Sequence, residues 1–372
     1  EVNKMKKISI IVAGLALVAA SCTKIETVEN GNGNVAGGIS FSAYASRLSK
    51  AAQEDVTTAN LLSFEASAVG NGAVYFDDVT FIKSTVWESS PVYFWPSFAL
   101  DFYAYNTPGS ATGFTPSISA DAQTIKVVPA AAIADQEDLV AACVKSKTEN
   151  DNNGKGAIAL TFNHYLTQLV VNAKCSNPTY KVVVEGVKLA NLAGEGTYNF
   201  RTASMEAMAE KINSATSSDY TASFDAKTLG SSACEVMTNA GNGRWYLVPQ
   251  AVDAWNQASE AKNATNGTYL ALKVKITANS DALNIYPTVG GSAWMAVPVP
   301  AQLKCEQGKK YNVTFDFFSA TGNGAGYVDP ETPGELDGNV LTEDNGKKII
   351  GGAIRFDATI DEWEDVNITI SL

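Results

Sequence analysis

The stretch Thr268-Tyr269-Leu270-Ala271-Leu272-Lys273-Val274-Lys275-Ile276 decides the fold class of this sequence. Its side chains alternate in character from one residue to the next, which matches a β-strand, where successive side chains point to opposite faces. Such a pattern is typical of an antiparallel sheet with one face on a core and the other face in water. The stretch therefore predicts a β-sheet protein.

Similar strand patterns recur along the chain between turn residues. Asn71-Gly72 lies between two of them and is the strongest hairpin signal. We expect strands at residues 39–44, 66–69, 74–76, 92–95, 100–105, 157–162, 166–173, 181–189, 198–200, 245–248, 269–276, 294–299, 311–318, 354–360 and 366–372. One helix is expected from Ala203 to Ile212, because Met205, Met208 and Ile212 have helical spacing. Many short strands with one short helix predict an all-β protein of two tandem β-sandwich domains.

The domain organisation follows from composition. A mature chain of about 350 residues is long enough for roughly two domains. Residues 146–156 (SKTENDNNGKG) are polar and rich in Asn and Gly, so we place the boundary there, with an N-terminal sandwich at 39–154 and a C-terminal one at 155–372. Residues 23–38 lack apolar periodicity and are expected to be a flexible tether.

Residues 1–22 have the features of an export signal. Met5-Lys6-Lys7 is followed by the apolar stretch Ile8 to Ala20 and by Ala19-Ala20-Ser21-Cys22, which is the order of a secretory signal peptide. The cysteine after small residues resembles a bacterial lipobox, so we expect cleavage before Cys22 and lipidation of its thiol. The alternative is an ordinary signal peptide with a chance cysteine. Met5 is the expected start, and residues 1–4 are read as an upstream extension.

Composition and charge limit the partners. The formal net charge is −12 without a long basic run, which makes nucleic acid and anionic membrane surfaces poor partners. Contact with a membrane is expected only through the lipid on Cys22. Beyond Cys22 the chain has Cys143, Cys175, Cys234 and Cys305, which form either two disulfides or buried free thiols; the sequence leaves both open.

Catalytic and cofactor motifs are scarce. His164 is the single histidine, which excludes a multi-histidine metal centre, and we expect it to be a structural residue at a strand end. Residues 329–344 are acidic but lack the spacing of a calcium loop, so we expect a solvated insertion. The chain is therefore not expected to be an enzyme or to carry a metal or cofactor, and an exported hydrolase is the weakest alternative. The tryptophans are expected in the core, although stacking on a sugar is an alternative; they are Trp87, Trp95, Trp245, Trp255, Trp294 and Trp363.

Several segments together resemble the fimbrillin superfamily, the subunits of type V pili, and in particular its fimbrillin-like (Mfa-like) branch. The segments are LTFNHYL (160–166) with Val170-Val171, VKLAN (187–191), GTYNF (196–200), YLVPQ (246–250), GKKYNVT (308–314) and IDEW (360–363). Gln168 departs from the pattern, where a basic residue is frequent, and so does the acidic insertion. The resemblance covers nearly the whole mature chain.

The resemblance implies two transthyretin-like sandwiches in a lipoprotein of the outer membrane or cell surface. Its expected partners are other pilus subunits and a host or bacterial surface ligand. Members that polymerise lose their first strand to an Arg-specific protease, which opens a groove for a neighbour's strand. Here it implies cleavage between Arg47 and Leu48, unless Arg47 is only a surface residue. A non-polymerising glycan-binding lipoprotein is the alternative function.

The expected donor strand is the segment from Val366 to Leu372. Its apolar residues Val366, Ile368, Ile370 and Leu372 alternate with polar ones, so they share one face, as a strand that fills a groove requires. The competing interpretation is a strand that completes its own sandwich.

Overall fold

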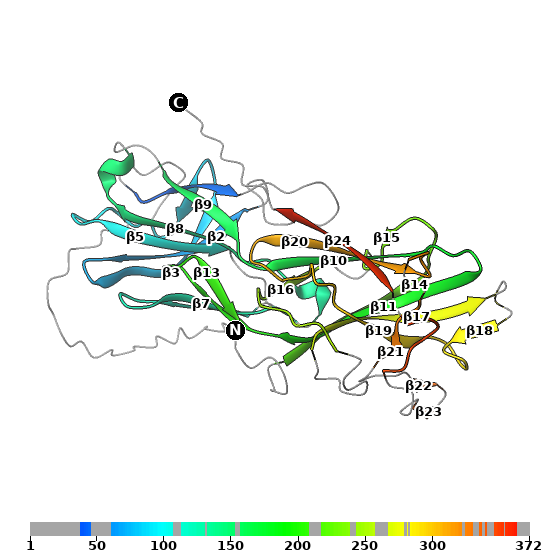
Figure 1. The fold of residues 1–372 in the computed structure, drawn as a ribbon. Helices are drawn as coiled ribbons and strands as arrows, with labels where there is room; N and C mark the ends of the chain where they lie inside the picture. Colours follow the sequence, from blue (N-terminus) through cyan, green and yellow to red (C-terminus); the bar gives the residue numbers. More distant parts are fainter. Residues whose placement is uncertain are drawn as a thin grey trace, which may run out of the picture.

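The computed structural model describes residues 38–45, 61–106, 113–130, 132–152, 157–207, 217–238, 243–256, 267–278, 281, 283–321, 324–329, 335–336, 339–340, 346–352 and 354–362. Within these residues the protein is built from strands, with two short 3-10 helices, η1 (Ile133–Asp135) and η2 (Glu149–Asn152). The predicted all-β class is confirmed. Figure 1 shows an elongated molecule, with β2, β3, β5, β8 and β9 towards one end and β14, β17 and β18 towards the other.

One end of the molecule is a closed barrel. Its strands are β1 (Phe41–Ala45), β2 (Ser63–Gly70), β3 (Ala73–Lys83), β4 (Trp87–Ser89), β5 (Leu100–Asn106), β8 (Val140–Lys147) and β9 (Ile158–His164). They pair in the order β1-β4-β3-β2-β5-β8-β9, and β9 returns to β1. The hairpin between β2 and β3 turns at Asn71 (φ 50°) and Gly72 (φ 74°), as the Asn-Gly pair predicts.

A second sheet combines segments that are distant in sequence. It consists of β6 (Gly113–Ile118), β7 (Gln123–Val128), β12 (Gly196–Asn199) and β13 (Ser204–Ala207), in the order β13-β12-β7-β6. Its buried residues form one apolar cluster with residues of β5 and with Tyr165, Leu166, Tyr246 and Val248. This cluster joins the barrel to the rest of the molecule.

Two further sheets enclose the largest core. The first contains β10 (Thr167–Cys175), β15 (Cys234–Glu235), β16 (Trp245–Leu247), β20 (Lys309–Phe317) and β24 (Arg355–Glu362), in the order β15-β10-β20-β24 with β16 also on β10. The second contains β11 (Tyr180–Ala193), β14 (Ser217–Thr228), β17 (Tyr269–Ala278), β18 (Leu283–Tyr286), β19 (Ala293–Pro298) and β21 (Tyr327–Val328). Its order is β14-β11-β17-β19-β21, with β18 on β17. The short strands β22 (Glu335–Leu336) and β23 (Asn339–Val340) pair with each other.

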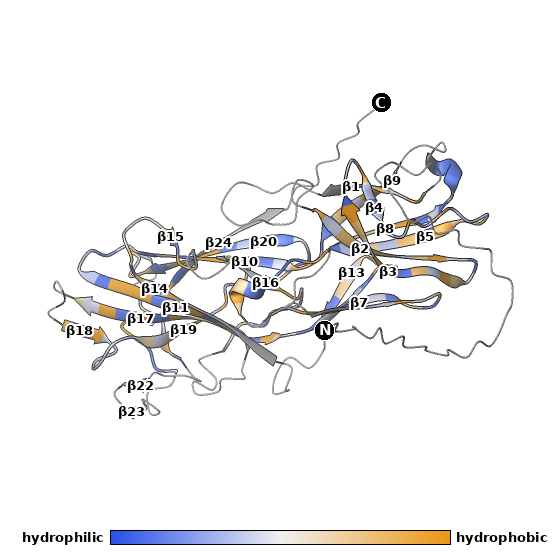
Figure 2. Ribbon diagram, turned by 180° about the vertical axis from the view of Figure 1, so that it is seen from behind, coloured by the Kyte–Doolittle hydropathy of each residue, from blue (hydrophilic) through white to orange (hydrophobic). Residues whose placement is uncertain are grey.

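The stretch that predicts the fold class is strand β17. Leu270, Leu272, Val274 and Ile276 are fully buried in the core between the two sheets. On the opposite face Lys273 and Lys275 are half-exposed, but Tyr269 and Ala271 are buried in a separate apolar cluster with Trp255 and Tyr327. The prediction of one wet face therefore holds only at Lys273 and Lys275. Figure 2 shows hydrophobic and hydrophilic positions interleaved along the strands at both ends of the molecule.

The predicted helix from Ala203 to Ile212 is wrong where the structure describes it. Ser204–Ala207 is strand β13, which pairs antiparallel with β12, and Met205 is buried opposite Tyr198. As part of a strand, Met205 is buried by β12 and by the adjacent apolar cluster. These tertiary contacts override the weak local preference for a helix. Residues 208–212 lie outside the described residues.

The segment expected to hold the domain boundary connects β8 to β9. These two strands pair with each other at Val140–His164 and Ala141–Asn163, and both belong to the barrel. The two-domain division with these bounds stays a prediction. Cys143, Cys175, Cys234 and Cys305 are free thiols; Cys175 and Cys305 are buried as that alternative expects, whereas Cys143 and Cys234 are half-buried. Among the described residues, no helix has the length and apolar character needed to cross a membrane.

Candidate assembly interface

Strand β1 closes the barrel by lying between two strands. On one side it pairs parallel with β9 over five residue pairs, from Phe41–Ile158 to Ala45–Phe162. On the other side it pairs with β4 at a single position, Phe41–Trp87. Strand β1 is therefore paired along its whole length with β9, but at only one position with β4.

Phe41 inserts into a pocket of three phenylalanine rings, here called the phenylalanine cage and formed by Phe64, Phe81 and Phe102. The centroid of the Phe41 ring lies 4.7 Å from Phe81, 5.2 Å from Phe102 and 5.7 Å from Phe64. All three pairs meet edge to face, at 67° to 84°, which is a favoured geometry for aromatic rings. Phe41 has no exposed surface, so the cage encloses it completely.

The residues before Phe41 fix its register. The Ile39 N–H donates to the Tyr93 carbonyl at 2.7 Å, and Gly38 forms a β-bridge with Phe94. Phe94 is itself held by the Tyr75 hydroxyl, which donates to its carbonyl at 2.7 Å. Because Ile39 is also buried, the strand is anchored by two apolar side chains two residues apart. We call the surface made by β9, β4, residues 93–94 and the phenylalanine cage the β1 seat.

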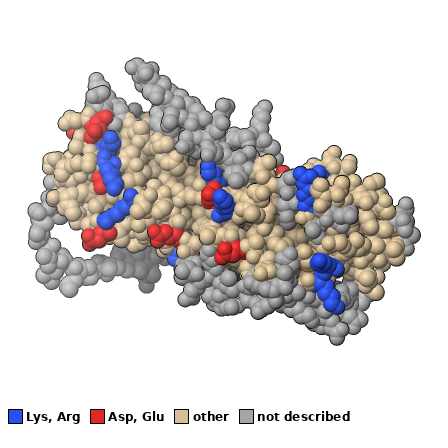
Figure 3. Space-filling view, viewed as in Figure 1, with Lys and Arg blue, Asp and Glu red and all other residues tan. Residues whose placement is uncertain are grey.

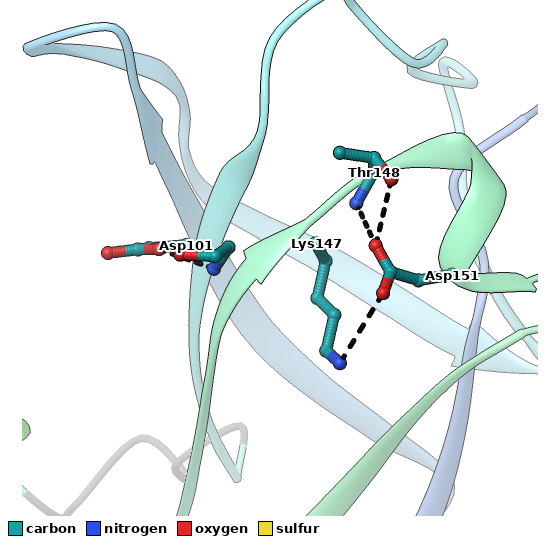
Figure 4. A network of polar contacts seen from close by, with 5 residues as sticks. Asp101, Lys147, Thr148 and Asp151 are labelled. Atoms are coloured by element: carbon teal, nitrogen blue, oxygen red, sulfur yellow. Dashed lines mark hydrogen bonds and ion pairs between the residues drawn. The ribbon is translucent and has the colours of Figure 1, made fainter.

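A tight polar turn follows β8, the strand that pairs with β9. The carboxylate of Asp151 in η2 accepts from the Thr148 N–H at 2.6 Å and from the Thr148 hydroxyl at 2.8 Å, and Lys147 lies 3.9 Å from it (Figure 4). The backbone hydrogen bond from Thr148 lowers the pKa of Asp151 below its ordinary value. Asp101 of β5 accepts from the Ser146 N–H at 2.8 Å. These contacts hold the turn that follows β8, within residues 146–151.

The predicted site residues are not brought together by any described contact. Cys22, Arg47, Leu48 and the four donor positions Val366, Ile368, Ile370 and Leu372 lie outside the described residues. The elements beside them are described: β1 ends at Ala45, two residues before Arg47, and β24 ends at Glu362, four residues before Val366. β24 is the last strand in its sheet and pairs only with β20 among the described strands.

Sequence reasoning missed a buried ion pair on the outer face of the β11–β17–β19 sheet. Lys188 Nζ lies 2.9 Å from Asp329 Oδ2, and the side chains are 5% and 0% exposed. The Tyr269 hydroxyl lies 3.3 Å from both Lys188 Nζ and Asp329 Oδ1, and the lysine stands over the Tyr269 and Trp294 rings. Asp329 is therefore not part of a solvated insertion. The sequence feature that could have indicated this buried ion pair is the position of Lys188 within the mostly apolar segment VKLANLA (187–193).

His164 lies at the end of β9, as predicted for a structural residue. Its Nδ1 contacts Asp138 Oδ2, and both side chains are 1% exposed. Asn106 links the same region by donating to the Asp138 carbonyl and accepting from the Val140 N–H, each at 2.9 Å. The pair is thus a structural contact where the barrel strands β5, β8 and β9 meet. In the part of the chain that the structure describes, no group of three or more His, Cys, Asp or Glu side chains is placed to hold a metal ion.

The described tryptophans do not form an exposed stacking platform. Trp87, Trp245 and Trp255 are buried, while Trp95 and Trp294 are half-buried. Trp363 lies outside the described residues. On the face shown in Figure 3, lysine, arginine and carboxylate groups form small separate groups of both signs.

Comparison with known proteins gives the family. The fimbrillin-like family profile matches residues 39–326. Among solved structures, a protein from Parabacteroides distasonis described as a putative cell adhesion protein has 10% sequence identity and a TM-score of 0.48, covering 90% of this chain and 99% of that chain. The fimbrilin FimA from Porphyromonas gingivalis has 10% identity and a TM-score of 0.45, covering 89% and 98%. The fimbrial anchor protein Mfa2 from the same organism has 13% identity and a TM-score of 0.34, covering 75% and 90%. Comparison with curated proteins found no match.

The chain belongs to the fimbrillin-like family, and its predicted resemblance is confirmed. This family is structural and adhesive, and it supports the role of a pilus subunit or adhesin in a cell-surface appendage.

Proposed function

We propose that this chain is a structural or adhesive subunit of a type V pilus, exported to the outer membrane as a lipoprotein on Cys22 and assembled by strand exchange between subunits. The observation that carries the proposal is the β1 seat. A single strand, bonded along one edge and anchored by Ile39 and Phe41, closes an otherwise complete barrel.

Removal of β1 would create the surface that assembly needs. It would leave the β9 edge with unpaired main-chain groups, and such an edge is a template for a strand from another chain. It would also uncover the phenylalanine cage. Strand addition combines main-chain hydrogen bonds with pockets for alternate side chains, and the β1 seat offers both. While β1 is in place, the precursor is protected against premature pairing.

The proposed maturation site is the Arg47–Leu48 bond. Because β1 ends at Ala45, a cut after Arg47 would detach the lipid, the tether and β1 together. N-terminal sequencing of surface-assembled protein is expected to begin at Leu48. A start at Cys22 would instead indicate an anchor subunit that keeps its lipid.

The proposed donor is the segment from Val366 to Leu372. Its four alternating apolar side chains would each contribute about 1.5–3 kcal/mol when fully buried in a neighbour. The segment follows β24 in the sequence, and β24 is an end strand of its sheet among the described strands. The partners are other pilus subunits, and a host or bacterial surface molecule is a further partner for an adhesive subunit.

Controlled proteolysis tests the proposal. A lipid-free form of the mature chain that lacks Cys22 (residues 23–372) is treated with an Arg-specific protease and analysed by size-exclusion chromatography and electron microscopy. We expect polymers from the wild type, none from Arg47→Lys, which keeps the charge but resists cleavage, and folded monomers from a chain lacking 366–372. Polymers from Arg47→Lys would contradict the maturation site, and failure of the shortened chain to fold would assign the segment to its own domain. A glycan array tests the alternative, since binding to one glycan class without polymerisation would favour it.

A further inference from the structure

We infer that the β1 seat selects its incoming strand by an aromatic ring at the position of Phe41, so that the partner carries an aliphatic residue, one intervening residue and then an aromatic residue. This inference rests on the proposed strand exchange and names the chemistry of the strand that the seat accepts. It also implies that the proposed donor segment, Val366 to Leu372, fills the seat of another copy of this chain less tightly than a strand that carries a ring would.

The cage is a socket for a ring rather than a general apolar pocket. Its three rings come from β2, β3 and β5, which all remain when β1 leaves. Each of the three rings makes an edge-to-face contact with the Phe41 ring, and the distances between ring centroids are 4.7–5.7 Å. The cage itself is braced, since Phe64 stacks on Phe81 at 5.7 Å and contacts Phe162 at 5.2 Å. A smaller side chain at this position would leave a cavity, because rings that are packed against each other can move only partly to fill it.

The register of the incoming strand is set outside the cage. The Tyr93 carbonyl accepts from the residue two positions before the ring, here Ile39. Successive side chains of a strand alternate, so the residue at the Ile39 position and the ring at the Phe41 position enter the same side of the seat. Ser40 and Ser42 are only half-buried, which leaves the intervening positions free to vary.

The segment from Val366 to Leu372 does not meet this requirement. Its sequence VNITISL has the correct alternation but no aromatic residue, so no register places a ring in the cage. An isoleucine or valine there would forgo the edge-to-face contacts and part of the buried area of a phenylalanine. A strand with a ring at the right spacing would therefore displace this segment in competition. The chemistry favours a different subunit as the strand donor to this seat.

Peptide exchange on the full mature chain tests the inference. A specific protease site is placed within residues 51–58, the chain is nicked, and fluorescent peptides are offered in competition with the resident β1. The peptides are residues 38–45 (GISFSAYA), the same peptide with Phe41→Ala, a matched control with Ser42→Ala, and residues 365–372 (DVNITISL). Fluorescence anisotropy gives the dissociation constants.

We expect the native and Ser42→Ala peptides to bind alike, and the Phe41→Ala and 365–372 peptides to bind about 100-fold or more weakly. In a chain with Phe81→Leu, which keeps the cage apolar but removes one ring, the preference for the native peptide should shrink. No uptake of the native peptide would overturn strand exchange and this inference together. Uptake of the native peptide with equal binding of the Phe41→Ala or 365–372 peptide would overturn the selection rule alone.

Discussion

At the scale of single residues, the least ordinary feature is the buried pair of Lys188 and Asp329. A buried charge is costly, and it is tolerated when it is paired and hydrogen-bonded. Here the lysine has a carboxylate at 2.9 Å, the Tyr269 hydroxyl at 3.3 Å and two aromatic rings beneath it. Asp329 is the first residue of the acidic stretch 329–344, so the pair fastens the start of that stretch to the sheet.

We expect Lys188→Met to lower the free energy of unfolding by about 3–5 kcal/mol, because it leaves the Asp329 carboxylate buried without its cation. The double variant Lys188→Met/Asp329→Leu should recover most of this loss. The control is Lys181→Met, since Lys181 and Asp281 form an ion pair at the same 2.9 Å distance but are 46% and 53% exposed. Its effect should stay below about 1 kcal/mol. Equal losses for both lysines in guanidinium unfolding would contradict this account.

Tyr103 gives a prediction for alkaline pH. Burial, with the nearby charge of Asp101 as the second cause, raises the pKa of Tyr103 from 10.0 to about 12. Above pH 10 the unfolded chain loses this proton while the folded chain keeps it, so the folded state is destabilised as the pH rises towards 12. Urea unfolding between pH 8 and 11.5 should show a shallower loss of stability for Tyr103→Phe than for the wild type. Parallel profiles would show that Tyr103 ionises alike in both states.

At the scale of elements, the β2–β3 hairpin depends on its turn. Gly72 has a φ of 74°, in the left-handed region, and a Cβ added there would meet nothing within 4 Å. The cost of Gly72→Ala is therefore conformational, about 1–2 kcal/mol. Gly291→Ala is the matched control, because its Cβ also meets open space and its φ is not left-handed. Thermal unfolding should show a lower Tm only for Gly72→Ala; an equal effect of both would mean that the turn conformation is not the cause.

At the scale of the whole molecule, the sheet of β6, β7, β12 and β13 couples the two ends. β7 and β12 pair from Gly196–Val127 to Asn199–Thr124, although some 70 residues separate them in the chain. Tyr198 of β12 is 1% exposed and packs on Tyr165 with ring centroids 4.1 Å apart. The barrel cannot lose this sheet without exposing the cluster around Tyr103 and Tyr198.

Calorimetry should therefore record one cooperative transition, with calorimetric and van't Hoff enthalpies in agreement. Tyr198→Ala should lower the Tm of that single transition by about 4–7 °C, as expected for removal of a large buried aromatic side chain. Glu206→Ala, at an exposed position of the neighbouring strand β13, is the control and should have little effect. Two resolved transitions would show that the ends unfold independently.

Local patterns in the sequence determined the all-β class, the Asn71-Gly72 turn, the inner face of β17 and the family. These features follow from alternation and from backbone angles that few residues adopt, both of which are properties of short segments. The first strand of the candidate site could be predicted in the same way, from Ile39 to Tyr44. Its cleavage and donor positions remain predictions.

Only the tertiary structure decided how the strands meet. It made Ser204–Ala207 a strand on β12, covered the outer face of β17 at Tyr269, buried Asp329 beside Lys188 and left the cysteines as free thiols. It also placed β1 parallel to β9 and surrounded Phe41 with rings from three other strands. The physical reason is that pairing and burial depend on which distant segments come together. A single strand pattern states which face is apolar, but not which neighbour will cover it.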